Sequence, residues 1–427
     1  MADSNFIVSV DIGSRKIVVL LADEENGKFT VTGHAIGDSA GVKKGVIVDA
    51  DQASQAIKKV AEVACLSCDI KSIFNVSTNI SDPHLTVINR DGHTFLPTNE
   101  VSEGNVKSAV KNACGIPTPT NKQVISSVIN HFILDKDSAT HPGVVTKHPI
   151  GQTATNLEVN MHIVTVSNQC VNAIEQSIRG SGFGLNNIVL NSMASSEIHI
   201  TQDEKDSGVC LVDIGAGVTN LSVFTKGGIT YSAVIQNGGD QITQDISDAF
   251  DTSFEEAERL KLKYGNAQVK SIREDKLVPF QQIDDDDPDQ SERYLSQQSL
   301  VEVIEQSYST IFSSIKKVLQ SQKLDRSLKS GFVLTGGATA IKGCDMLMLS
   351  CVSVRTKLGR VNFDKITTKK VHFESILKDS SKYPSYACAL GLLLFEPNES
   401  DFNFRGKQTN KQTSILSKIR DHLSTKL

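Results

Sequence analysis

Two short acidic hairpins in this sequence carry residues that could hold a phosphorylated ligand. The stretch 209–224 (VCLVDIGAGVTNLSVF) predicts an apolar strand that ends at Asp213, a turn that Gly215 and Gly217 make possible, and a second strand. The backbone N–H groups of such a turn can bind phosphate oxygens, and the carboxylate can hold the water shell of Mg²⁺. An ordinary hairpin gives a similar string, so this stretch alone does not establish a site.

The same plan occurs at the N-terminus, where residues 6–31 (FIVSVDIGSRKIVVLLADEENGKFTV) repeat the order of strand, Asp-Ile-Gly turn, strand, glycine turn and strand. Asp11 takes the place of Asp213. A third loop, 331–343 (GFVLTGGATAIKG), sets a glycine pair between an apolar strand and an expected helix. A repeat this long is a duplicated supersecondary unit and not a short solenoid repeat. It predicts two similar domains that face each other across a cleft, each offering one hairpin to a ligand.

The elements that must position these loops follow from the periodicity of apolar residues. A helix is expected over 53–64, with Ala56, Ile57, Val60, Ala61 and Ala64 on one face. Strands are predicted at 6–10, 17–22, 28–35, 73–78 and 188–190, and helices at 171–179 and 299–319. Within 84–164, strands are predicted at 85–89, 124–132 and 157–164, and a helix at 102–113. Residues 191–194 are expected to be the link between the two halves.

Composition excludes several classes of protein. The 427 residues carry a formal net charge of −5, lack tryptophan and show no basic stripe, which argues against nucleic acid binding. No stretch is long enough to span a membrane, and Met1 to Phe6 lead directly into a strand, so no signal peptide is expected. The eight cysteines are expected to be reduced and mostly buried, and Cys65 and Cys68 to pack in a core and not to bind zinc.

Three motifs, DIGSRKI (11–17), DIGAGVTNL (213–221) and VLTGGATAIKG (333–343), resemble the phosphate and adenosine motifs of the actin, Hsp70 and sugar kinase superfamily. Within it the chain resembles the FtsA family, bacterial actin-like proteins that tether the division ring to the membrane. Further stretches that support this narrower match are 33–60, 194–215, 231–250, 257–265 and 386–395. The resemblance implies an α/β, actin-like duplicated ATPase fold with two large lobes around a nucleotide cleft, each with an inserted small subdomain.

The resemblance also implies a site for ATP and Mg²⁺. The phosphates would be bound by Asp11, Gly13, Ser14, Arg15, Lys16, Asp213, Gly215, Ala216, Gly217 and Val218. Asp11 and Asp213 would hold Mg²⁺ through water. The adenosine would pass Gly336, Gly337 and Ala338, and the ribose or base would contact Glu258 and Lys261.

Two further pieces are expected to border this site. Gly238 and Gly239 are expected to let the ligand approach a helix that Asp240 caps. Glu258 and Lys261 share one face of a helix, so an ordinary solvated salt bridge is an equal alternative to a ligand contact.

Groups for hydrolysis are depleted in comparison with the superfamily. Asn191 is the nearest match to a Gln or Glu that orients the attacking water, and an amide cannot act as a base. The second phosphate motif has Ala216, Val218 and Asn220 where the superfamily often has Gly, Thr and Asp. We therefore expect at most slow ATPase activity and assign no catalytic residue.

Changes in composition and in the pattern of apolar residues, together with the resemblance, suggest a division into subdomains. We expect subdomain 1A at 1–83, 165–197 and 384–396, inserted subdomain 1C at 84–164, 2A at 198–240 and 330–383, 2B at 241–329, and a flexible linker at 397–412. The acidic run Asp284 to Asp289 predicts an exposed loop, since like charges repel and Pro288 breaks regular structure. A calcium site is the alternative, but the run lacks the glycine and the terminal glutamate of an EF-hand loop.

The resemblance implies partners for several of these parts. Subdomain 2B would bind the C-terminal tail of FtsZ, with Lys261, Lys263, Lys270 and Arg273 near a groove for a partly acidic peptide. Subdomain 1C would serve filament contacts and other division proteins, although a structural lid is the plainer alternative. Repeated head-to-tail association of the chain would form filaments.

Residues 413–427 (TSILSKIRDHLSTKL) predict an amphipathic, membrane-targeting helix. Its apolar arc is formed by Ile415, Leu416, Ile419, Leu423 and Leu427. Lys418 and Arg420 flank the arc and suit anionic lipids, whereas Lys426 falls inside it. The alternative is that this helix docks on the protein's own core.

Together these expectations describe a peripheral protein on the cytoplasmic side of the bacterial inner membrane, at the division septum. A small-molecule kinase of the same superfamily is the alternative, but it would need a catalytic acid beyond Asp11 and Asp213. A chaperone of the Hsp70 type would need a substrate domain after the ATPase.

Overall fold

A computed structural model of the protein describes residues 6–68, 73–115, 118–136, 143–282 and 293–395. Of these, residues 6–85 and 167–395 form unit 1, and residues 86–166 form unit 2. Each unit is described by itself. Within the described ranges, no helix is both long and apolar enough to cross a lipid bilayer.

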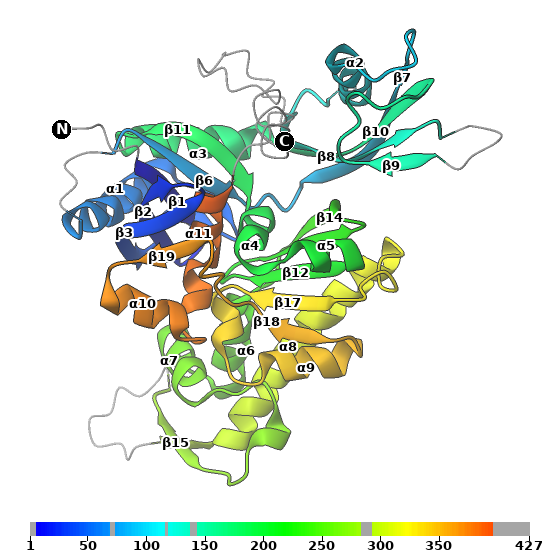
Figure 1. Ribbon diagram of the computed structural model, residues 1–427. Helices are drawn as coiled ribbons and strands as arrows, with labels where there is room; N and C mark the ends of the chain where they lie inside the picture. The colour runs from blue at the N-terminus through cyan, green and yellow to red at the C-terminus, as the bar shows by residue number, and fades with distance from the viewer. Residues whose placement is uncertain (1–5, 69–72, 116–117, 137–142, 283–292, 396–427) are drawn as a thin grey trace. The chain divides into compact units, whose positions relative to one another are not determined.

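The first sheet of unit 1 is built on the N-terminal hairpin. Its strands, in spatial order, are β11 (Gly184–Leu190), β6 (Asn75–Ile80), β1 (Phe6–Ile12), β2 (Lys16–Glu25), β3 (Lys28–Asp38) and β19 (Ile366–Thr368). Strands β1, β2 and β3 are antiparallel neighbours, whereas β6 runs parallel to β1. We call this sheet and the helices packed on it lobe 1 (Figure 1).

The second sheet repeats that plan around the second hairpin. Its strands, in spatial order, are β14 (Gly228–Ile235), β13 (Thr219–Thr225), β12 (Val209–Ile214), β17 (Gly331–Thr335) and β18 (Thr356–Leu358). Again three consecutive strands are antiparallel, and a later strand, β17, lies parallel to the first. This sheet and its helices are lobe 2, and the predicted duplication is confirmed.

The helices of lobe 1 are α1 (Ala50–Leu66), α3 (Asn168–Gly180), α4 (Asn191–His199), α10 (Val371–Lys378) and α11 (Ala387–Leu394). Helix α1 starts where the Asp49 side chain accepts hydrogen bonds from the first-turn N–H groups. Its predicted face is mostly right: Ile57, Val60 and Ala61 are buried, although Ala53 is buried where Ala56 was expected.

Lobe 2 carries α8 (Gln297–Ser321), the longest of the described helices, which extends beyond the predicted 299–319 at both ends. Leu300, Ile304 and Ile311 of its apolar stripe share one core with Val212 and Leu221 of the sheet. The remaining elements of lobe 2 are α5 (Gln202–Ser207), α6 (Gly239–Phe250), α7 (Phe254–Tyr264), β15 (Leu277–Phe280), β16 (Arg293–Ser296) and α9 (Cys344–Val352).

Residues 191–194, predicted as the link between the halves, form the first turn of helix α4, which contacts β6 and β11 of lobe 1 and β12 and β13 of lobe 2. Asn191 to Ala194 are all buried, and Gly391 of α11 comes so close that a Cβ there would lie 1.8 Å from the Ala194 carbonyl oxygen. Eight of the nine residues of this short helix are buried and five of those eight are polar, so no apolar periodicity indicates the helix in the sequence.

In its described residues, unit 2 is a small α/β unit with one helix and a four-stranded sheet. Its elements are β7 (Thr86–Phe95), α2 (Glu103–Cys114), β8 (Lys122–Leu134), β9 (Val144–Thr146) and β10 (Asn156–Ser167), with sheet order β7-β10-β8-β9. Ser102 and Asn105 cap helix α2 reciprocally. The strands and the helix predicted within 85–164 are therefore confirmed.

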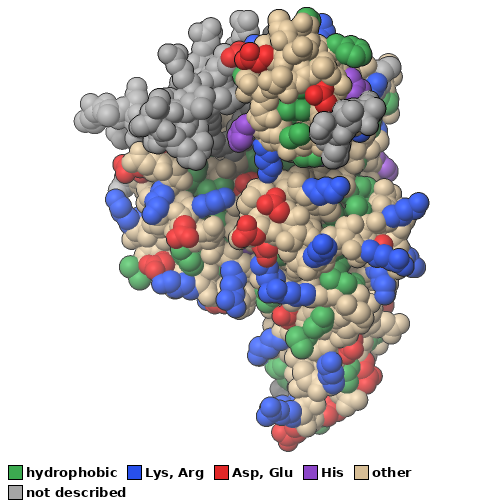
Figure 2. Space-filling view, turned by 45° about the vertical axis from the view of Figure 1, so that its right-hand side comes forward, with side chains coloured by type: hydrophobic (Ala, Val, Ile, Leu, Met, Phe, Trp, Pro, Cys, Tyr) green, Lys and Arg blue, Asp and Glu red, His purple; other side chains and the backbone are tan. Residues whose placement is uncertain are grey.

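Two further features are the distribution of surface charges and a short hairpin beside the predicted site. On the face shown in Figure 2, Lys and Arg side chains lie interspersed with Asp and Glu side chains. A short β4–β5 hairpin (Val42–Lys43 and Val46–Ile47) stands next to the tip of the second hairpin, since a Cβ at Gly217 would lie 2.8 Å from the Lys44 Cα.

Candidate functional site

The two predicted hairpin carboxylates are buried at the ends of their strands. Asp11 is 8% exposed and Asp213 is 4% exposed. Burial raises the pKa of Asp11 to about 6, with Lys16 opposing the shift and Asp213 adding to it. Burial also raises the pKa of Asp213, against a hydrogen bond from Ser195 and the charge of Lys16. Two adjacent buried acids make a place where a cation is strongly favoured.

Lys16 lies between these acids and interacts with both. Burial lowers the pKa of Lys16 to about 8, while Asp11 and Asp213 raise it. The ammonium group faces the third loop as well, because a Cβ at Gly337 would lie 3.2 Å from its Nζ. One lysine cannot balance two ionised carboxylates, so the cluster keeps a net negative charge that a divalent ion can offset.

Amide and hydroxyl groups fix the two carboxylates. Asn79 Nδ2 donates to Asp11 Oδ1 at 2.7 Å and to Asn191 Oδ1 at 3.2 Å. Ser195 Oγ donates to Asp213 Oδ2 at 2.6 Å, and Asn191 also hydrogen-bonds Asp213. The structure therefore brings Asn191 to the carboxylates, as part of a network of neutral groups.

Sequence reasoning missed three members of this cluster. Asn79 is the second-last residue of β6, the parallel neighbour of β1, and because Asn75, Ser77 and Thr78 of this strand are also polar, it did not stand out in the sequence. Ser195 sits on the overlooked helix α4. Cys388 is buried on α11, and its thiol hydrogen-bonds Asp11.

The tips of the two hairpins meet. Gly13 N donates to Lys16 O at 3.0 Å and Gly215 N donates to Val218 O at 2.9 Å, so each turn closes on itself. A Cβ at Gly217 would lie 2.6 Å from Ser14 Oγ. Glycine is needed at this place because any side chain would push the tips apart.

The third loop comes to the same place. Gly336 has φ of +90°, and a Cβ there would lie 2.4 Å from Asp213 Oδ1. The next residues form a short 3₁₀ turn (Gly337–Ala340), and the Ala338 carbonyl accepts a hydrogen bond from the buried Tyr308 hydroxyl. All three predicted loops are therefore brought together.

The start of helix α6 differs from its prediction. Asp240 does not cap the helix: the N-cap residue is Gly238, without a side-chain cap. The N–H groups of Gly239 and Asp240 donate to the carbonyls of Gly215 and Ala216, at 2.9 and 2.8 Å. The first turn of α6 is therefore joined to the second hairpin by backbone hydrogen bonds.

Glu258 and Lys261 form an ion pair, 2.7 Å between Oε2 and Nζ, but not a solvated one. Lys261 is 8% exposed and donates to Gly239 O and Thr243 Oγ1 at 3.0 and 2.6 Å. Burial lowers its pKa, Glu258 and Asp240 raise it, and Arg15 lowers it further. The interpretation as a solvated salt bridge is therefore wrong for Lys261, whose ammonium group lies against the first turn of α6.

Arg15 is engaged by lobe 2. Its Nε donates to Asp240 Oδ1 at 2.7 Å, and its guanidinium lies 4.3 Å from the centroid of the Phe254 ring. Asp240 therefore pairs across the lobes, where a helix cap within lobe 2 was expected.

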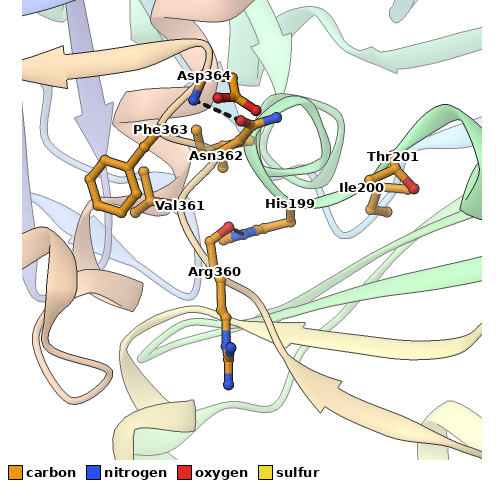
Figure 3. Close-up of a pocket in the computed structure, with 9 residues that line it drawn as sticks. His199, Ile200, Thr201, Arg360, Val361, Asn362, Phe363 and Asp364 are labelled. Carbon is orange, nitrogen blue, oxygen red and sulfur yellow. Dashed lines mark hydrogen bonds between the residues drawn. The ribbon is translucent and has the colours of Figure 1, made fainter.

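A separate pocket of about 360 Å³ lies at the segments that connect the two sheets (Figure 3). Within it, His199 Nε2 is 2.9 Å from Thr335 Oγ1, and burial lowers the His199 pKa to about 4. None of the predicted ligand residues lines this pocket. It is lined by Ile198, His199, Ile200, Thr201, Arg360, Val361, Asn362, Phe363 and Asp364.

The predicted burial of the cysteines is right for only some of them. All eight cysteines are free, but only Cys210, Cys344 and Cys388 are buried, and the other five are partly exposed. Among the residues that the structure describes, no three His, Cys, Asp or Glu side chains gather as a metal site. The acidic run at 284–289, the linker and the amphipathic segment at 413–427 lie outside the described residues.

Comparison with known proteins identifies relatives over most of the chain. The family profile "Cell division protein FtsA" matches residues 210–391, and "SHS2 domain inserted in FTSA" matches residues 83–165. Cell division protein FtsA of Pseudomonas aeruginosa is 30% identical over 392 residues, covering 91% of this chain and 88% of the relative. That of Escherichia coli K12 is 25% identical, covering 97% and 95%.

Solved structures with a similar fold include the PilM–PilN type IV pilus biogenesis complex, with a TM-score of 0.63 at 16% identity, covering 91% of this chain and 97% of that one. MreB5 of Spiroplasma citri bound to ADP gives 0.56 at 13% identity, covering 92% and 96%. Likenesses at this level show the fold alone. It is the actin-like fold that the motifs predicted, with an inserted SHS2 domain.

Proposed function

Because the chain belongs to the FtsA family of cell division proteins, we propose that it is an ATP-binding, filament-forming adaptor that links the FtsZ ring to the membrane. The convergence of Asp11, Lys16 and Asp213 with three glycine-containing loops carries this proposal. Such a cluster suits a nucleotide with a divalent cation, because glycine turns offer N–H groups to phosphates and the carboxylates can hold the hydrated ion.

The residues fit Mg-ATP in type. Gly217 and Gly336 let the three loops approach closely, since a Cβ there would lie 2.6 Å from Ser14 Oγ and 2.4 Å from Asp213 Oδ1, and Gly337 lies next to Lys16. The two hairpin turns would supply N–H groups to the phosphates, and Lys16 a positive charge. Asp11 and Asp213 would hold Mg²⁺ through its water, since the ion offsets the net negative charge of the cluster.

We infer that the protein hydrolyses ATP slowly. The groups next to the carboxylates are the amides of Asn79 and Asn191 and the hydroxyl of Ser195, which hold positions but are poor bases. Loss of a positioned general base typically lowers a rate by about 10²–10⁴-fold. The family match does not favour a small-molecule kinase, and turnover comparable to that of a sugar kinase would contradict this inference.

Partners would divide among the subdomains. Subdomain 2B (241–329) would bind the FtsZ tail, 1C (84–164) other division proteins, and 413–427 anionic lipids. The match of residues 83–165 to an inserted SHS2 domain supports a separate 1C, and the relatives' role in cell division supports septal partners. The protein would act on the cytoplasmic side of the cell membrane.

Calorimetry with Mg-ATP tests the site. Gly336→Ala should weaken binding at least about tenfold, because the new Cβ would displace Asp213. Gly27→Ala is the matched control: Gly27 also has positive φ, but a Cβ there meets nothing within 4 Å. Equal affinities of the two variants would contradict the proposed site. If Gly336→Ala does not fold, Asp213→Asn provides the same comparison against Asp203→Asn, at an exposed position of α5.

A further inference from the structure

Arg15 joins the two lobes at the place where the hairpin tips meet. It stands on the tip of the β1–β2 hairpin of lobe 1. Its partners Asp240 and Phe254 belong to lobe 2, in the first turns of α6 and α7. The 2.7 Å bond to Asp240 and the ring contact at 4.3 Å therefore both cross from lobe to lobe.

The neighbours of Arg15 face the proposed nucleotide site. Ser14 Oγ lies against Gly217 of the second hairpin, and Lys16 Nζ lies against Gly337 of the third loop. Asp240 follows Gly239, whose carbonyl holds Lys261. Any separation of the lobes at the hairpin tips therefore stretches the contacts of Arg15.

We propose that Arg15, Asp240 and Phe254 form a latch that keeps the lobes closed and slows the exchange of a bound nucleoside triphosphate. The latch rests on the nucleotide site proposed above. It gives Arg15 a positioning role, in which the guanidinium acts on lobe closure and not on the reacting atoms.

The chemistry of the latch suits arginine in particular. A planar guanidinium can stack on Phe254 and donate to Asp240 at the same time, which a lysine ammonium cannot do equally well. The side chains of Arg15 and Asp240 are 41% and 35% exposed, so solvent and salt weaken the ion pair. We therefore expect a several-fold effect on rates and not an all-or-none gate.

Release of a fluorescently labelled ATP from the full-length protein, chased with excess Mg-ATP, measures the latch. Arg15→Lys and Asp240→Asn should each speed release about three- to tenfold. Arg15→Asp should do the same, and adding Asp240→Arg should slow release again. Lys28→Gln, at an exposed cation of lobe 1 away from the site, is the control and should leave the rate unchanged. Raising the salt concentration should speed release from the wild type more than from Asp240→Asn.

If the Arg15 and Asp240 variants release labelled ATP at the wild-type rate, the contact is an ordinary surface ion pair and the latch is refuted. If the wild-type protein binds no labelled ATP, the proposed function fails instead. The latch is then judged by hydrogen exchange: Asp240→Asn should speed amide exchange at the β1–β2 tip, and unchanged exchange there would refute it.

Discussion

At the scale of single residues, the protein holds two carboxylates and one lysine in a buried cluster whose charges do not balance. A carboxyl group with a higher pKa in the folded than in the unfolded chain favours folding in its protonated form. For Asp11 this contribution is present below about pH 4 and is lost as the pH rises through 6. At neutral pH the ionised Asp11 should therefore lower the folding stability of the ligand-free protein, and a bound cation should restore it.

Asp11→Asn tests this cost, because asparagine mimics the neutral carboxyl. The melting temperatures of the variant and the wild type should agree near pH 4. Above pH 6 the variant should melt higher, by roughly 5 °C. Glu24→Gln, at an exposed position of β2 in the same sheet, should follow the wild type throughout. A constant difference between Asp11→Asn and the wild type from pH 4 to 8 would show that Asp11 does not titrate in this range.

Sequence patterns located the loops of the site but not the groups between them. Asp11, Asp213 and the glycines stand in local motifs, so their turns could be predicted from neighbouring residues. Asn79, Ser195 and Cys388 reach the carboxylates only through the packing of β6, α4 and α11. Contacts between segments so far apart in sequence leave no local signal, and the pairing of Arg15 with Asp240 is of the same kind.

At the scale of elements, regular patterns predicted strands and helices well, and tertiary contacts decided the exceptions. The apolar stripes of α1 and α8 and the alternation in β7, β8 and β10 match the structure. Helix α4 was missed because its residues 191–196 are held by burial and not by periodicity. Strand and helix ends were placed short because terminal turns depend on caps and neighbours.

The segment 413–427 is the element on which membrane attachment depends in this account. Ile419→Glu with Leu423→Glu puts two charges into the predicted apolar arc and should abolish binding to anionic vesicles. Ser417→Glu with Ser424→Glu adds the same charge to the opposite, polar face and should weaken binding much less. Co-sedimentation measures both variants, and equal binding by the two would rule out an amphipathic anchor.

At the scale of the whole molecule, the two lobes share a plan, and lobe 2 shares one core between the intervals predicted as subdomains 2A and 2B. Deleting 241–329 would remove α8 from that core, so surface charges are a sharper probe of FtsZ binding. Lys261 of α7 does not suit the predicted role at the peptide groove, because it is buried and its ammonium group donates to the Gly239 carbonyl of α6.

The exposed cations Lys263, Lys270 and Arg273 remain as candidates for the partly acidic FtsZ tail. Changing all three to glutamate should weaken binding of the tail peptide about tenfold or more, as measured by fluorescence anisotropy. The same reversal at exposed lysines 28, 58 and 59 of lobe 1 changes the net charge equally and should have little effect. If both sets weaken the peptide equally, net charge and not a site on lobe 2 governs the interaction.

The central claim is that ATP in the hairpin site drives assembly, and that assembly makes membrane binding firm through many weak anchors. Co-sedimentation of the full-length protein with anionic vesicles, with and without Mg-ATP, tests it most directly. The account predicts that Mg-ATP raises the bound fraction severalfold for the wild type and leaves Gly336→Ala unchanged. Equal sedimentation of the wild type with and without Mg-ATP would contradict it.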